Sequence, residues 1–242
     1  LIQGVDEPIL KERKEVMQVI CDSVDKKKRY YLTLQLLKSQ TSEWTSKGDS
    51  AERNSSVWIG KQIHINIDSL GNRLKLWNPD STLIATTLGG IFQPYLFFPL
   101  KENCKRLNQS WLIKTQDTLY ENSYPPGNID QTSLFRLKDN INTETDSSLM
   151  ITFVKTARGF YGINTAEMNF IIDAKINSYG ELMLSIIDEI PKDYTATQEL
   201  KMQLKYPDGR EIPIWQYTTI HYAISELKRN KIEFEKQKKS RR

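Results

Sequence analysis

The chain has 242 residues, with 34 Lys and Arg residues against 30 Asp and Glu residues, two cysteines and two histidines. This length allows one large domain or two small ones, since roughly 100–200 residues per domain is usual. A hydrophobic content of 38% and a charged content of 26% are typical of a globular chain and exclude a disordered one. Two cysteines exclude a disulfide-rich mini-domain, and so few Cys and His residues predict neither a structural metal site nor a cofactor.

The net charge of +4 is concentrated at the C-terminus. From Ala223 to Arg242 there are eight basic residues against three acidic ones, a local charge of +5, so the other 222 residues sum to −1. The basic residues are Lys228, Arg229, Lys231, Lys236, Lys238, Lys239, Arg241 and Arg242. A near-neutral body argues against a general basic face for nucleic acid, and the tail is the candidate electrostatic contact.

The first eighty residues contain two strong strand patterns and one ambiguous segment. Residues 29–37 are rich in β-formers, and Ile63, Ile65 and Ile67 alternate with polar residues before a turn at 68–72. Residues 7–17 fit a helix with Pro in its first turn, but a strand at 15–24 that turns at 25–28 fits nearly as well. Both alternatives stay open.

Two more hairpins are expected in the second half. The stronger pattern pairs residues 169–176 with residues 181–187 across a turn at 177–180, and the other pairs 201–206 with 211–215 across a turn at 207–209. Pro213 cannot donate a hydrogen bond within a sheet, so its strand is expected either to lie at an edge or to end there.

Further strands and polar connections complete the pattern. Strands are expected at 110–118, 133–138 and 149–155, and polar loops or hairpin tips at 39–56, 120–131 and 139–148. The apolar spacing of residues 222–238 favours a helix. We therefore expect a mainly β fold, with antiparallel hairpins that form a sandwich or an open barrel, and a C-terminal helix. In this organisation residues 1–221 form a β-rich domain, with two packed lobes that meet near 120–131, and residues 222–242 form a basic helical tail.

An aromatic segment between two prolines is the candidate docking site. Residues 91–100 are too short and too interrupted to span a membrane. A contiguous aromatic patch that stays exposed marks an interaction site, whereas core packing is the alternative reading of the same residues. The residues assigned to partner or ligand docking are Phe92, Tyr95, Phe97, Phe98 and Trp111.

Part of the chain resembles exported bacterial lipoprotein domains of unknown function. Those domains place a Pro-Leu pair about ten residues before a Gly-x-x-Trp, and this chain has Pro99-Leu100 and then Asn108-Gln-Ser-Trp111, without the glycine. They continue with hairpins of the type seen in Phe170-Ile-Ile-Asp173 and Gly180-Glu-Leu182. The resemblance covers roughly residues 92–187. It implies a β-rich fold and an envelope location, and it transfers no catalytic residue.

Catalytic motifs are absent from the sequence. It contains no phosphate-binding loop, no His-Glu-x-x-His and no Gly-x-Ser-x-Gly. The histidines His64 and His221 are interpreted as ordinary strand and junction residues, and Gly159 and Gly162 as a turn or bulge. Whether Cys21 pairs with the other cysteine, Cys104, needs spatial information. The five tryptophans fit a core better than a sugar-binding or single-strand-binding platform, because the near-neutral body offers no charged groove.

These observations favour a non-enzymatic protein of the bacterial cell envelope, periplasmic or associated with the outer membrane. It would act as a lipoprotein-like accessory subunit that binds a partner protein or an apolar ligand, with the tail attached to an acidic surface such as anionic lipid headgroups. One alternative is nucleic-acid binding through the tail, and another is a hydrolase that acts on glycans. The sequence alone leaves the partner, the oligomeric state and a preceding leader or lipid anchor undetermined.

Deleting residues 224–242 should weaken attachment to anionic lipid vesicles and remove most of its dependence on salt, because exposed charges are screened by ions. Co-sedimentation of the full and the shortened chain at low and high salt measures this. Equal attachment of both chains under both conditions would contradict the role of the tail.

Overall fold

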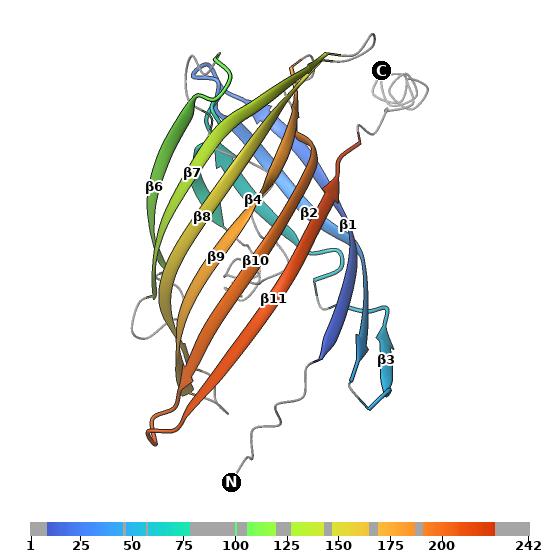
Figure 1. Cartoon of the computed structure of the whole chain (residues 1–242), viewed down its shortest axis with the longest axis vertical. Coiled ribbons are helices and arrows are strands. Elements are labelled where there is room, and N and C mark those ends of the chain that lie inside the picture. Colours follow the sequence, from blue (N-terminus) through green and yellow to red (C-terminus); the bar gives the residue numbers. More distant parts are fainter. Residues whose placement is uncertain are drawn as a thin grey trace, which may run out of the picture. The chain divides into compact units, whose positions relative to one another are not determined.

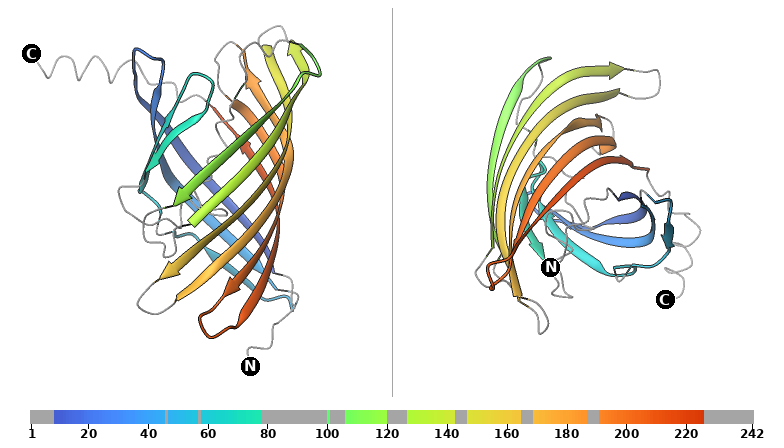
Figure 2. Two further views of the ribbon diagram at one scale, coloured as in Figure 1. Left: turned by 90° about the vertical axis from the view of Figure 1, so that its left-hand side faces the viewer. Right: turned by 60° about the horizontal axis from the view of Figure 1, so that its bottom comes forward.

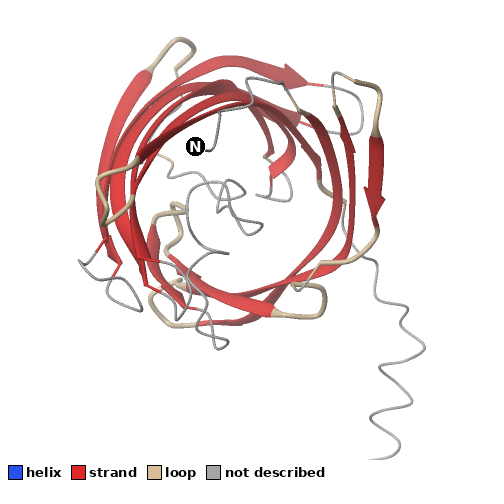
Figure 3. Cartoon of the chain, turned by 90° about the horizontal axis from the view of Figure 1, so that it is seen from below, coloured by secondary structure: helices blue, strands red, loops and turns tan. Residues whose placement is uncertain are grey.

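The computed structural model describes residues 9–45, 47–56, 58–77, 100, 106–119, 127–142, 147–164, 169–186 and 191–225. Within these ranges every regular element is a β-strand, and the strands form two antiparallel sheets (Figures 1 and 3). The prediction of a mainly β fold is confirmed. No helix that could cross a membrane occurs in this described part. The expected C-terminal helix is not shown, since Tyr222 and Ala223 belong to a strand and residues 226–242 lie outside the described ranges.

The chain divides into two compact units, each built around one sheet. The first unit contains the strands up to residue 77, and the second contains the body of the six strands that follow. The predicted meeting point of two lobes near 120–131 stays a prediction, because residues 120–126 lie outside the described part.

The first sheet has five strands: β1 (Leu10–Val24), β2 (Tyr30–Trp44), β3 (Ser50–Arg53), β4 (Gln62–Ile67) and β5 (Arg73–Trp77). Their order is β1-β2-β4-β5, and β3 pairs with the far end of β2. Alternate side chains of two neighbouring strands are buried, Leu32, Leu34 and Leu36 on β2 and Ile63 and Ile65 on β4. Successive side chains of a strand point to opposite faces, so this alternation produces one apolar face.

The structure resolves the two open readings at the N-terminal end. Strand β1 runs from Leu10 to Val24, so the strand alternative is confirmed and the helix alternative is wrong. The segment 39–56, expected as a polar loop or a hairpin tip, contains the end of β2 and strand β3, which pair as a hairpin. The hairpin at 68–72 is also confirmed, and Gly71 occupies a left-handed conformation with φ of 82°, which glycine adopts without steric cost.

The second sheet contains β6 (Ser110–Leu119), β7 (Gly127–Asn142), β8 (Ser147–Asn164), β9 (Asn169–Ser185), β10 (Pro191–Lys205) and β11 (Glu211–Ala223). The six strands lie side by side in chain order, as Figure 2 shows. The turn at 207–209 joins β10 to β11 as expected, and Gly209 has a φ of 84°. Strand β11, which carries Pro213, is the last strand in this order, in agreement with the predicted edge position.

A row of stacked aromatic rings crosses the buried face of the second sheet. Trp111 stacks on Phe135 at 5.4 Å between ring centroids, and Phe135 lies 6.3 Å from Phe153. On the other side, Tyr194 stacks on Tyr222 at 5.7 Å. Aromatic pairs at such distances add stability beyond the area that they bury.

The two halves of this row meet across β9. Phe153 on β8 and Tyr194 on β10 stack at 5.6 Å with ring planes only 6° apart, although β9 lies between their strands. Strands are spaced about 4.8 Å apart, so the two backbones are roughly twice that distance from each other. Gly180 of β9 makes the contact possible, since a Cβ atom there would lie 2.9 Å from the Phe153 ring and 2.1 Å from the Thr195 carbonyl oxygen.

This geometry corrects the strongest hairpin expected from the sequence. Residues 177–180 form no turn: β9 continues without interruption from Asn169 to Ser185 and pairs with β10 along this length. The Asn-Ser-Tyr-Gly stretch has the composition of a turn, but its glycine serves close packing of rings in an extended strand.

Gly180→Ala should lower the free energy of unfolding by about 3 kcal/mol or more, because the added methyl group meets backbone atoms that cannot move aside cheaply. Chemical denaturation of the full chain measures the change. Gly209→Asn is the control: nothing lies within 4 Å of its added Cβ and Asn tolerates the left-handed conformation, so it should cost about 1 kcal/mol or less. Equal stability of Gly180→Ala and the unmodified chain would contradict the role of this glycine.

Candidate functional site

Three large aromatic side chains stand on the exposed face of the second sheet. Tyr179 on β9 is 57% exposed, and Trp215 and Tyr217 on β11 are 72% and 65% exposed. Strand β10 lies between them and presents Thr197, Glu199 and Lys201 to the same face. We call these three aromatic residues, with the β10 residues between them, the aromatic face.

Glu199 is the centre of a hydrogen-bond network on the aromatic face. Asn177 donates its side-chain amide to the Glu199 carboxylate at 3.3 Å, and the Lys201 ammonium lies 3.0 Å from the other carboxylate oxygen. Hydrogen bonds from Lys201 first and then Asn177, with a smaller contribution from Trp215, hold the pKa of Glu199 below its usual range. Glu199 is therefore ionised at neutral pH.

The same network holds the aromatic rings in place. The Lys201 ammonium lies 5.7 Å from the centroid of the Trp215 ring, a cation–π distance. A hydrogen bond with Tyr179 raises the pKa of Tyr217, so the Tyr217 phenol stays neutral in the physiological range. Rings that are restrained before binding lose less conformational freedom when a ligand covers them.

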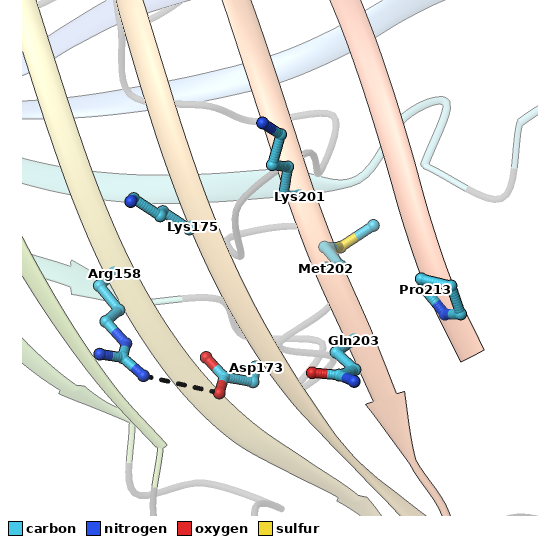
Figure 4. Close-up of a pocket in the computed structure, with 7 residues that line it drawn as sticks. All are labelled: Arg158, Asp173, Lys175, Lys201, Met202, Gln203 and Pro213. Carbon is cyan, nitrogen blue, oxygen red and sulfur yellow. Dashed lines mark ion pairs between the residues drawn. The ribbon is translucent and has the colours of Figure 1, made fainter. Parts of the chain in front are cut away.

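A shallow charged hollow adjoins the aromatic face (Figure 4). Arg158, Lys175 and Lys201 line it together with a single carboxylate, that of Asp173. Arg158 and Lys205 approach this carboxylate only to 3.8 Å and 3.6 Å. Lys175 has no ion-pair partner within the described ranges. We call this the basic hollow, because its lining carries three positive charges against one negative charge.

A second polar cluster lies on the first sheet. An irregularity in the register of β1 leaves Asp22 between the paired residues Cys21 and Ser23. The Thr33 hydroxyl lies 2.5 Å from an Asp22 carboxylate oxygen and 2.9 Å from Nδ1 of His64. The Thr33 hydroxyl donates its single proton to the Asp22 carboxyl group and therefore accepts from the Nδ1–H of His64.

The histidines and Gly159, which the sequence analysis interpreted as structural residues, take part in structural contacts. His64 also stacks on Trp77 at 5.1 Å, and His221 lies within β11 with its Nε2 2.9 Å from Asp193. Gly159 lies within β8, where a Cβ would come within 3.0 Å of the Ile129 side chain, so it permits close packing and does not form a turn. Cys21 is a free, exposed cysteine, and Cys104 lies outside the described residues.

Of the docking residues expected from the sequence, the structure describes Trp111 alone. Trp111 is only 6% exposed and belongs to the buried aromatic row, so we leave it out of the binding surface. The other four docking residues (Phe92, Tyr95, Phe97 and Phe98) and the basic tail residues from Lys228 to Arg242 lie outside the described part.

The expectation that the tryptophans form a core holds for Trp58 and Trp111 but is wrong for Trp215, which is 72% exposed. The sequence did not predict the aromatic face, although part of its signal was present. Ile212 and Ile214 alternate with Trp215 and Tyr217 along β11, so the two rings had to face away from the isoleucines. Tyr179 gives no such signal, because the residues around it have the composition of a turn.

No family model, curated protein or solved structure matches the chain. Among the described residues, no group of three or more His, Cys, Asp or Glu side chains is arranged to hold a metal ion. The aromatic face and the basic hollow are therefore the features of the chain that bear on its function.

Lys201→Met should raise the pKa of Glu199 toward the ordinary value for glutamate, because it removes the largest stabilising hydrogen bond of the carboxylate. Titration of the Glu199 carboxyl carbon by NMR measures the shift. Lys114→Met, on β6 of the same sheet, is the matched control and should leave this pKa unchanged. An unchanged titration of Glu199 in the Lys201 variant would contradict the network.

Proposed function

We propose that this protein is a non-enzymatic binding protein of the bacterial cell envelope, a lipoprotein-like accessory subunit that recognises an envelope component through the aromatic face. The observation that carries the proposal is the exposure of Tyr179, Trp215 and Tyr217 on one regular sheet surface. The envelope location is supported by the resemblance to exported lipoprotein domains, and the predicted sandwich or open barrel remains part of the proposal.

The energetics of exposed rings support a binding role. Fully burying a large apolar side chain stabilises a complex by roughly 1.5–3 kcal/mol. A ligand that covers the three exposed rings can gain a contribution of this kind from each of them. Tyr and Trp are enriched at binding surfaces and among the residues whose removal weakens binding most. The contacts of Trp215 with Glu199 and Lys201 restrain its ring, which lowers the entropic cost of association further.

The surroundings of the aromatic face favour a surface contact over an enclosed apolar ligand. The hollow next to it is open and is lined by Arg158, Lys175 and Lys201, which suit polar or charged groups. The basic tail remains, as a proposal, a second attachment to an acidic surface.

The double variant Trp215→Ala/Tyr217→Ala should reduce binding of the full chain to a washed bacterial envelope fraction by about tenfold or more, since such residues dominate binding energies. Co-sedimentation against increasing amounts of the fraction measures this. Trp44→Ala removes an exposed tryptophan from the first sheet, 37% exposed, and should bind as the unmodified chain does. Circular dichroism establishes that each variant is folded. Equal binding by a folded double variant would overturn the proposal.

A further inference from the structure

We propose that the aromatic face and the basic hollow together bind an acidic polysaccharide, a chain of sugars that carries carboxylate groups. This inference rests on the proposed binding function and names the chemical class of its ligand. It follows from three properties of the exposed face of β8–β11: restrained rings, a charged centre and an adjoining excess of positive charge.

The spacing of the rings suits a chain of flat units with apolar faces. Tyr179 and the pair Trp215 and Tyr217 stand on strands separated by β10, so apolar and polar groups alternate across the face. The C–H faces of a sugar ring are apolar and pack on aromatic rings, while its hydroxyl groups point sideways. These hydroxyls would meet the polar side chains of β10.

The charged centre of the aromatic face favours a sugar over a protein as the ligand. The core of a protein–protein interface is depleted in charged residues, whereas Glu199 and Lys201 lie between the rings here. Covering both charges with apolar side chains would remove them from water without replacement hydrogen bonds, which is costly. Sugar hydroxyls both donate and accept, so they can satisfy the carboxylate and the ammonium together.

The basic hollow favours a ligand that carries negative charge. Lys175 lacks an ion-pair partner within the described ranges, and Arg158 lies 3.8 Å from its carboxylate neighbour Asp173. Lys175 is on β9 and Arg158 is on β8 (Figure 4). Both strands lie on the side of β10 that is opposite to the edge strand β11. A carboxylate placed here would form charge-assisted hydrogen bonds, which are stronger than those between neutral groups.

A single-stranded nucleic acid fits this surface less well. Such ligands combine base stacking with a positive groove that follows the phosphates. Glu199 remains ionised between the rings, since hydrogen bonding lowers its pKa, and it would repel a phosphate chain that crosses the face. Sparse carboxylates on a sugar chain can reach the basic hollow while neutral hydroxyls cover Glu199.

The test uses the full chain and oligogalacturonate, with its methyl ester as the uncharged counterpart of the same sugar. Calorimetric titration should show binding of the acid about tenfold tighter than binding of the ester, a difference of about 1.4 kcal/mol. Trp215→Ala should weaken binding of both probes by about tenfold, because both use the ring. Lys175→Gln should weaken only the acid, whereas Lys114→Gln, the matched lysine on β6, should change neither.

Further outcomes separate this inference from the proposed function. Polyglutamate and single-stranded oligothymidylate are the competing probes for an acidic protein and a nucleic acid. Binding of either one as tightly as oligogalacturonate, with the same loss in Trp215→Ala, would overturn the sugar assignment. Absence of oligogalacturonate binding would also overturn it, while envelope binding that still depends on Trp215 and Tyr217 would leave the proposed function standing. Equal binding of acid and ester would remove the basic hollow from the ligand site.

Discussion

The stack of Phe153 on Tyr194 is the contact on which the second sheet depends. The two rings belong to β8 and β10 and meet across β9, which is possible only where β9 has no side chain, at Gly180. A shift of one residue in the register of β9 would replace Gly180 between the two rings by a neighbouring residue and would turn the other face of β9 toward them. The contact therefore selects one register for three strands, and Trp111, Phe135 and Tyr222 extend it to the others.

A single register on the buried face also determines what the exposed face presents. Side chains alternate between the two faces along a strand. Tyr194 and Leu200 on β10 are buried, so Glu199 and Lys201 of the same strand lie on the exposed face. Pairing with β9 and β11 then sets Asn177 and Tyr217 beside Glu199. The candidate binding surface is thus a consequence of core packing.

The first sheet combines an ordinary apolar face with an unusual polar one. The irregular pairing at Asp22 directs a carboxylate toward Thr33, whose hydroxyl also contacts His64. Bulges of this kind redirect a side chain that regular pairing would place elsewhere. Thr33 is only 5% exposed, so the two hydrogen bonds satisfy a hydroxyl that would otherwise be buried at a cost.

The sequence by itself determined the β class, the alternation of β2 and β4, and the turns at Gly71 and Gly209, because these features depend on local periodicity and on backbone conformations that glycine favours. Only the tertiary structure decided the role of Gly180, since its turn-like neighbours are indistinguishable from a true turn until β8 and β10 supply the rings that cross it. The same holds for the aromatic face. Alternation could assign Trp215 and Tyr217 to one side of a strand, but their assembly with Tyr179 and Glu199 required the register of three strands, which is a long-range property of the sheet.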